Sequence, residues 1–163
     1  MATAIEIETI EAKILEWLRT DPRQRVQPPM HTYLQTIRSY AGDFEQEVLA
    51  GVPTLAPAAF TIFAGAEFRD LSNVEQEADF RFSIYLVSQT LKGNEGARRG
   101  YPGHIGAYRM LTDVRKLLVG EQFNIPSFPP MLMVSHAVIM NTMAISVYDA
   151  MFITKNHIIP QGQ

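Results

Sequence analysis

Residues 78–89 (ADFRFSIYLVSQ) alternate between two kinds of side chain along most of their length. Positions 80, 82, 84 and 86 hold Phe, Phe, Ile and Leu, whereas positions 81, 83, 85 and 87 hold Arg, Ser, Tyr and Val. A strand points successive side chains to opposite faces, so this period of two predicts a strand with one face in a core. The fold is therefore expected to be built on a sheet that is covered on at least one face.

Four further segments have the β-branched and aromatic content that is typical of strands: residues 32–40, 58–65, 131–140 and 144–154. The last two are separated only by a short joint at Asn141-Thr142, which implies an antiparallel hairpin. The polar segment Phe68–Ala78 is predicted to be a hairpin connection or an exposed arm.

Two amphipathic helices are predicted. The first covers residues 5–19 and ends near Asp21-Pro22, and the second covers residues 104–119 and is stopped by Gly120. A short helix is also expected at residues 44–49. The fold class is therefore α+β, a two-layer sandwich in which two long helices pack on one face of a mainly antiparallel sheet of about five strands. We expect a single domain over residues 1–155 and a flexible C-terminal tail over residues 156–163.

Composition excludes several classes of protein. The 163 residues include no cysteine, which rules out disulfides, thiolate metal sites and a cysteine nucleophile. The net charge of −3 is not that of a dedicated nucleic-acid binder. Glutamates interrupt the N-terminal apolar residues, and no uncharged apolar run is long enough for a membrane span, so neither a signal peptide nor a membrane association is expected.

A glycine-rich segment with two adjacent arginines, GNEGARRGYPGHIG, precedes the second predicted helix. No Gly-Lys pair is followed by Ser or Thr, so a Walker loop is absent, and the glycines at 100, 103 and 106 do not have dinucleotide-fingerprint spacing. Arg98 and Arg99 at a helix entrance are able to bind an anion or an acidic surface. We favour a mobile interface arm or a solvated loop over a phosphate site, because glycine-rich polar linkers are usually flexible.

The remaining reactive side chains predict no chemistry. The histidines at 31, 104, 136 and 157 form neither HxH nor HExxH, and the serines include no GxSxG elbow. We expect no catalytic residue, no metal and no cofactor, and hence no enzyme. His136 is interpreted as a hydrogen-bonded core or interface histidine, and Asp149 as a carboxylate that pairs with Arg81 or Arg38 or lies on an interface rim.

Several blocks of the sequence, taken in order, resemble the Mu-like bacteriophage tail protein family. They are IEIETIEAKILEWL, IRSYAG, PAAFTIFAG, FRFSIYLVSQ, ARRG and GAYRMLTDVRKLLVG, and they span most of the chain. The resemblance implies a structural tail-completion or tail-terminator protein. Such proteins have a compact α+β fold and form a ring of six subunits that caps the head-proximal end of the tail tube.

The resemblance also implies partners and a location. The partners would be further copies of the chain, the tail tube or sheath protein and the head–tail connector, with at most non-specific passage of DNA through the lumen. The chain would be assembled in the host cytoplasm and reside in the tail or neck of the virion. By this analogy, the residues that reach neighbouring subunits or the tube are Phe68, Arg69, Asp70, Arg98, Arg99, Gly100 and Tyr101.

Two alternatives remain open at the level of sequence. One is a small-molecule or anion-binding domain that uses the glycine–arginine segment. The other is an adaptor or baseplate component of a contractile tail-like machine.

Overall fold

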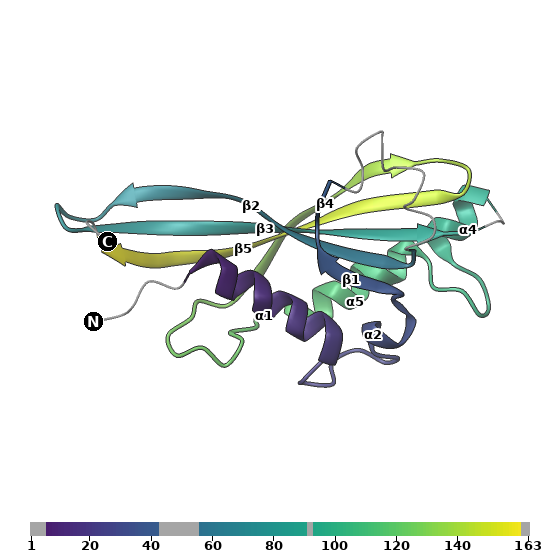
Figure 1. The fold of residues 1–163 in the computed structure, drawn as a ribbon, viewed down its shortest axis with the longest axis horizontal. Coiled ribbons are helices and arrows are strands. Elements are labelled where there is room, and N and C mark those ends of the chain that lie inside the picture. The colour runs from purple at the N-terminus through teal and green to yellow at the C-terminus, as the bar shows by residue number, and fades with distance from the viewer. Residues whose placement is uncertain (1–5, 43–55, 91–92, 161–163) are drawn as a thin grey trace.

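The computed structural model describes residues 6–42, 56–90 and 93–160. The chain passes through four helices and five strands in these ranges (Figure 1), in the order α1 (Ile7–Thr20), α2 (Met30–Tyr33), β1 (Thr36–Ser39), β2 (Ala58–Asp70), β3 (Glu75–Gln89), α4 (Gly93–Arg99), α5 (Ala107–Leu118), β4 (Leu132–Asn141) and β5 (Ile145–Pro160). The helix that was expected at residues 44–49 lies outside the described residues.

The five strands form one sheet in the order β1-β2-β3-β5-β4. Three of the four pairings are antiparallel, and only the short edge strand β1 runs parallel to its neighbour β2. The prediction of an α+β fold with a mainly antiparallel sheet of about five strands is confirmed. The expectation of two long helices fits less well, because α1 and α5 have 14 and 12 residues and two short helices accompany them.

The main core lies between the helices and one face of the sheet. The alternation in β3 is confirmed, because Phe80, Phe82, Ile84 and Leu86 all belong to this core. Helix α1 contributes Ile10, Ile14, Trp17 and Leu18, and α5 contributes Met110, Val114 and Leu117 among others. The loop between α5 and β4 also enters the core, since Phe123 packs edge-on against Trp17 with ring centroids 5.1 Å apart.

Residues 32–40 were expected to form one strand, which is wrong for the first part. The short helix α2 (Met30–Tyr33) forms there instead, with Pro29 as its N-cap and the Pro29 carbonyl accepting from Thr32 N at 3.0 Å. A proline before a helix costs no helical hydrogen bond, and this local signal prevails over the β-branched composition. The strand begins only at Thr36 and pairs with β2.

Strand β2 is longer than expected, because Gly65 does not end it. This glycine has φ +123° and sits at a register shift between Phe63 and Gly65, so it bends the strand without terminating it. Residues 68–78 then complete a hairpin with a turn over residues 71–74, which confirms the prediction of a hairpin connection.

Strand β5 extends to Pro160, whose partner is Glu75. Residues 156–160 are therefore not a flexible tail, and residues 161–163 lie outside the described part. Together the end of β2, the start of β3 and the end of β5 make a three-stranded arm that projects beyond the helical layer (Figure 1). We call residues 66–79 and 154–160 the arm.

Helix α5 begins at Ala107 and not at residue 104, because residues 100–106 form a tight turn in front of it. No helix of the described residues is both long enough and apolar enough to cross a membrane.

Candidate assembly surfaces

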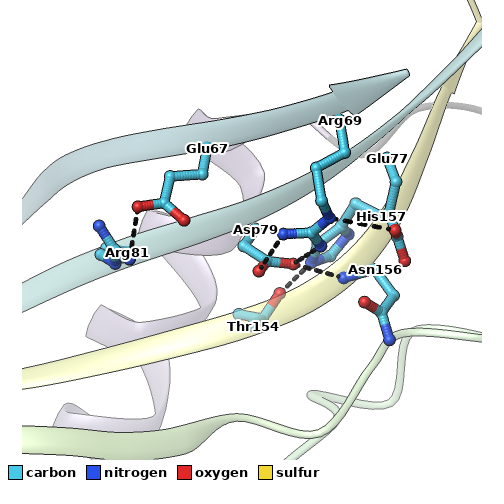
Figure 2. Close-up of polar contacts among 8 residues, drawn as sticks. All are labelled: Glu67, Arg69, Glu77, Asp79, Arg81, Thr154, Asn156 and His157. Carbon is cyan, nitrogen blue, oxygen red and sulfur yellow. Dashed lines mark hydrogen bonds and ion pairs between the residues drawn. The ribbon is translucent and has the colours of Figure 1, made fainter. Parts of the chain in front are cut away.

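On one face of the arm, a network of ion pairs joins β2 to β3 (Figure 2). Arg69 on β2 binds Asp79 on β3 through both terminal nitrogens, at 3.0 and 2.9 Å, and its Nε lies 3.3 Å from Glu77 Oε2. Arg81 on β3 reaches back to Glu67 on β2 at 2.9 Å. A bidentate arginine–carboxylate pair fixes geometry as well as charge, so these contacts hold the register of the hairpin.

Asp79 is the buried member of this network. Its hydrogen bonds from Arg69 lower the pKa of the carboxyl against the opposing effect of burial, and the backbone N–H of Asn156 adds a further bond at 2.9 Å. Asn156 adopts a left-handed conformation with φ +64°, at the place where the register of β5 against β3 shifts. Asparagine tolerates this conformation better than most residues, so the bulge aims its N–H at Asp79.

The opposite face of the arm is apolar. Phe68, Ala78 and His157 are neighbours across the three strands, and His157 is buried between the rings of Phe80 and Phe128, at 4.7 and 5.3 Å. His157 Nε2 is hydrogen-bonded to Thr154 Oγ1. Burial lowers the pKa of His157, and the negative charge of Asp79 opposes that shift. The net effect favours the neutral imidazole.

The end of the arm exposes several large apolar side chains. Phe68 is 55% exposed, Leu71 is 52% exposed and Val74 is 65% exposed, and Ile158 is accessible on β5, the other outer strand of the arm. Phe68 and the two residues after it, Arg69 and Asp70, are three of the residues that were predicted to meet neighbouring proteins. The structure places all three on the projecting arm, where a partner can reach them.

The other predicted interface segment is folded and not a mobile arm. Residues 93–99 form α4, in which Arg98 Nε donates to Asn94 Oδ1 at 2.6 Å. The Nη1 of Arg98 donates to Tyr108 Oη at 2.8 Å, and this bond raises the pKa of the guanidinium and lowers that of the phenol. Asn94 Nδ2 in turn donates to Thr142 O at 2.7 Å, which ties the helix to the β4–β5 turn.

The glycines after α4 serve a close contact between two backbone segments. A Cβ on Gly106 would lie 2.3 Å from Gly100 N and 2.5 Å from Arg98 O, and one on Gly100 would lie 2.6 Å from His104 O. Between them, Tyr101 stacks on His104 with ring centroids 4.8 Å apart. The glycine pattern therefore reflects a packed turn, which explains why it matched no phosphate-binding motif.

The structure does not bring the two predicted groups together. The arm and α4 lie at opposite ends of the molecule (Figure 1). Of the second group, Arg99 is the most exposed, and it pairs within α4 with Glu95 at 3.3 Å.

A third surface, which the sequence did not reveal, follows the edge strand β4. Leu132, Val134, Val138 and Ile139 are each more than two-fifths exposed. Beside them, an open hollow lies between this strand and the end of α5, lined by Arg115, Val119 and residues 132–136. His136 is exposed here, so the core alternative for this histidine is wrong, because β4 has a neighbour on one side only. The interface alternative stays a prediction.

The alternative in which Asp149 pairs with Arg81 is wrong, because Arg81 binds Glu67. The guanidinium of Arg38 lies over the Phe60 ring at 4.9 Å, and a place for Asp149 on an interface rim stays a prediction. Burial raises the pKa of the half-buried Asp149 carboxyl, and a hydrogen bond with the Ser83 hydroxyl lowers it by a smaller amount. Within residues 6–42, 56–90 and 93–160, no three His, Cys, Asp or Glu side chains gather as a metal-holding group.

The geometry is thus dominated by exposed apolar strand ends and interlocked ion pairs. The family model described as Bacteriophage Mu, Gp37 matches residues 7–155 of the chain. The chain belongs to this family. Membership indicates a structural, tail-related protein of a Mu-like bacteriophage and an association with the virion.

The matched range of the Gp37 family covers the helical layer and the whole sheet up to the base of the arm on β5. Comparison with curated proteins gives no match to the chain. Family membership therefore gives the setting in which the protein works.

Proposed function

We propose that this Gp37-family protein is a non-enzymatic tail terminator, whose copies form a ring at the head-proximal end of the phage tail. The ring, six-membered by analogy, would cap the tube or the sheath and offer its other side to the head–tail connector. DNA would pass through its lumen without specific contacts.

The observation that carries this proposal is the placement of exposed apolar side chains on two different parts of one small domain. Most of the large exposed apolar residues lie on the arm or along β4 and the neighbouring end of α5. A ring repeats one contact between two unlike surfaces of each subunit, and the chain presents such a pair. Apolar exposure of this kind marks sites of protein association.

The proposal is tested by electron microscopy of purified protein and of tails. Purified chain added to tail tubes that were assembled without it is expected to form rings at one end of each tube and to stop further growth. Tubes of uncontrolled length in its presence, with no density at either end, would rule out termination. Density at the baseplate end would assign the protein to a distal adaptor role instead.

The glycine–arginine segment is tested in the same assay by Arg99→Ser, which leaves the Arg98 contacts in place. A normal ring with this variant would remove Arg99 from the list of interface residues. Loss of tube binding by a folded variant would support its predicted role.

A further inference from the structure

The arm and the β4 surface differ in charge as well as in position. Between residues 67 and 77, four carboxylates accompany a single arginine, which gives a net charge of −3. Arg69 is already engaged by Asp79 and Glu77, whereas the exposed carboxylate of Glu75 has no ion-pair partner among the described residues. The end of the arm is therefore apolar and acidic.

The hollow beside β4 has the opposite character. Arg115 lines it and Lys116 follows on the exposed side of α5. In the part of the chain that the structure describes, the guanidinium of Arg115 makes no ion pair. With Leu132, Val134 and Val119 around it, the hollow is apolar and basic, and complements the arm on both counts.

Strand β4 is also open as an edge. Its ten residues, LMVSHAVIMN, include no charged residue and no proline, which are the usual protection of an exposed edge. The outer strands of the arm do carry such protection, with Lys155 and Pro160 on β5 and alternating charges on β2. An edge that is long, apolar and unprotected favours a partner that covers it.

The arm of a chain cannot fill that chain's own hollow. Leu132 lies opposite Ile153 on β5, and the hairpin end of the arm lies opposite Pro160, seven residues further along the same strand. At ~3.3 Å per residue this is roughly 20 Å, and the intervening sheet is continuous. An arm that fills the hollow must therefore come from another copy.

We propose that the arm of one copy docks on β4 and the end of α5 of the next copy, with Leu71 and Val74 against the apolar hollow and Glu75 facing Arg115. The contact is head-to-tail, since the two surfaces are unlike. It rests on the proposed function in that it names the subunit contact of the ring, but it is measurable without any tail component.

The absence of cysteine from the chain makes a direct test possible. Val74→Cys and Val134→Cys place one thiol on each surface, at side chains that are 65% and 53% exposed, and Met143→Cys supplies a control at 85% exposure. We expect oxidation of an equimolar mixture of the arm and β4 variants to give a disulfide-linked pair. Either variant alone, or the arm variant mixed with the control, should remain uncrosslinked.

A chain that carries both Val74→Cys and Val134→Cys should give a ladder of linked species or a closed ring. Crosslinking of Val134→Cys to itself, in preference to Val74→Cys, would show that two β4 edges pair directly and would overturn the proposal. Yields no higher than those of the Met143→Cys control would also overturn it.

Charge reversal adds a second measurement. Arg115→Glu and Glu75→Lys should each reduce the crosslinking rate of the Val74–Val134 pair about tenfold, and the two reversals together should restore it. Rings on tails without this crosslink would refute the contact and leave the terminator role standing. Formation of the crosslink without any binding to tails would support the contact and refute the terminator role.

Discussion

At the scale of single residues, Asp79 has the largest influence on the arm because it is buried and accepts from both Arg69 and Asn156. Asp79→Asn removes the charge that strengthens these bonds, and we expect the free energy of unfolding to fall by about 1–2 kcal/mol at pH 7. Urea unfolding measures this change. Glu67→Gln, at an exposed pair with Arg81, is the control and should change stability by less than about 0.5 kcal/mol.

The loss of stability caused by Asp79→Asn should depend on pH. The pKa of Asp79 is lowered in the folded state, so its stabilisation is present above the unfolded value of about 4 and is lost as the pH falls through the folded value. The stabilities of the wild type and Asp79→Asn should therefore converge as the pH falls below about 4. A difference that stays constant over this range would mean that the substitution acts through shape and not through charge.

In the turn before α5, two glycines are required for different reasons, which the sequence alone does not distinguish. Gly106 is needed for a close contact, and Gly103 is needed for its backbone conformation. Gly106 has an ordinary backbone conformation, so Gly106→Ala acts through steric contact, with Gly100 N at 2.3 Å and Arg98 O at 2.5 Å. Gly103 has φ +85° and open space around it, so Gly103→Ala acts only through backbone strain of about 1 kcal/mol. We expect Gly106→Ala to destabilise more, by over about 2 kcal/mol. Equal thermal unfolding midpoints for the two variants would show that the backbone moves apart at no cost.

At the scale of elements, the end of β5 is a segment whose strand structure could not be predicted from the sequence. The polar residues Lys155 and Asn156 suggested a frayed tail, but they occupy a bulge, and the alternation resumes beyond it with His157 buried. A bulge shifts the period of two by one residue, and only the partner strand reveals it. By contrast, β3 was predicted correctly because its alternation is unbroken over residues 80–86, where every second side chain belongs to the main core.

The contribution of this strand end is measurable by truncation. A chain that ends at Lys155 loses His157 from the apolar layer, the N–H of Asn156 that binds Asp79, and the ladder with residues 75–78. We expect a loss of roughly 2–4 kcal/mol of unfolding free energy, whereas a chain that ends at Pro160 should match the full length. Unchanged stability of the shorter chain would restore the prediction of a flexible tail.

At the scale of the whole molecule, the sequence was informative about local pattern and uninformative about exposure. It predicted the fold class, the β4–β5 hairpin and the projecting segment with Phe68, all of which follow from periodicity and turn residues. It did not predict that β4 is an edge, because an apolar run reads the same at the edge as at the centre of a sheet. The core alternative for His136 was wrong for that reason.

This distribution of exposure predicts a pattern of amide hydrogen exchange. In the free chain, the arm beyond the helical layer and the open edge β4 should exchange by local opening, while β3 within residues 82–87 exchanges only on global unfolding. On assembly, residues 68–76 and residues 132–139 should become protected together and to the same degree, because each copy contributes one surface to one contact and the other surface to the next. Mass spectrometry of free and assembled protein resolves both segments. Protection of β4 with an arm that still exchanges freely would separate the two surfaces and assign β4 to a different partner.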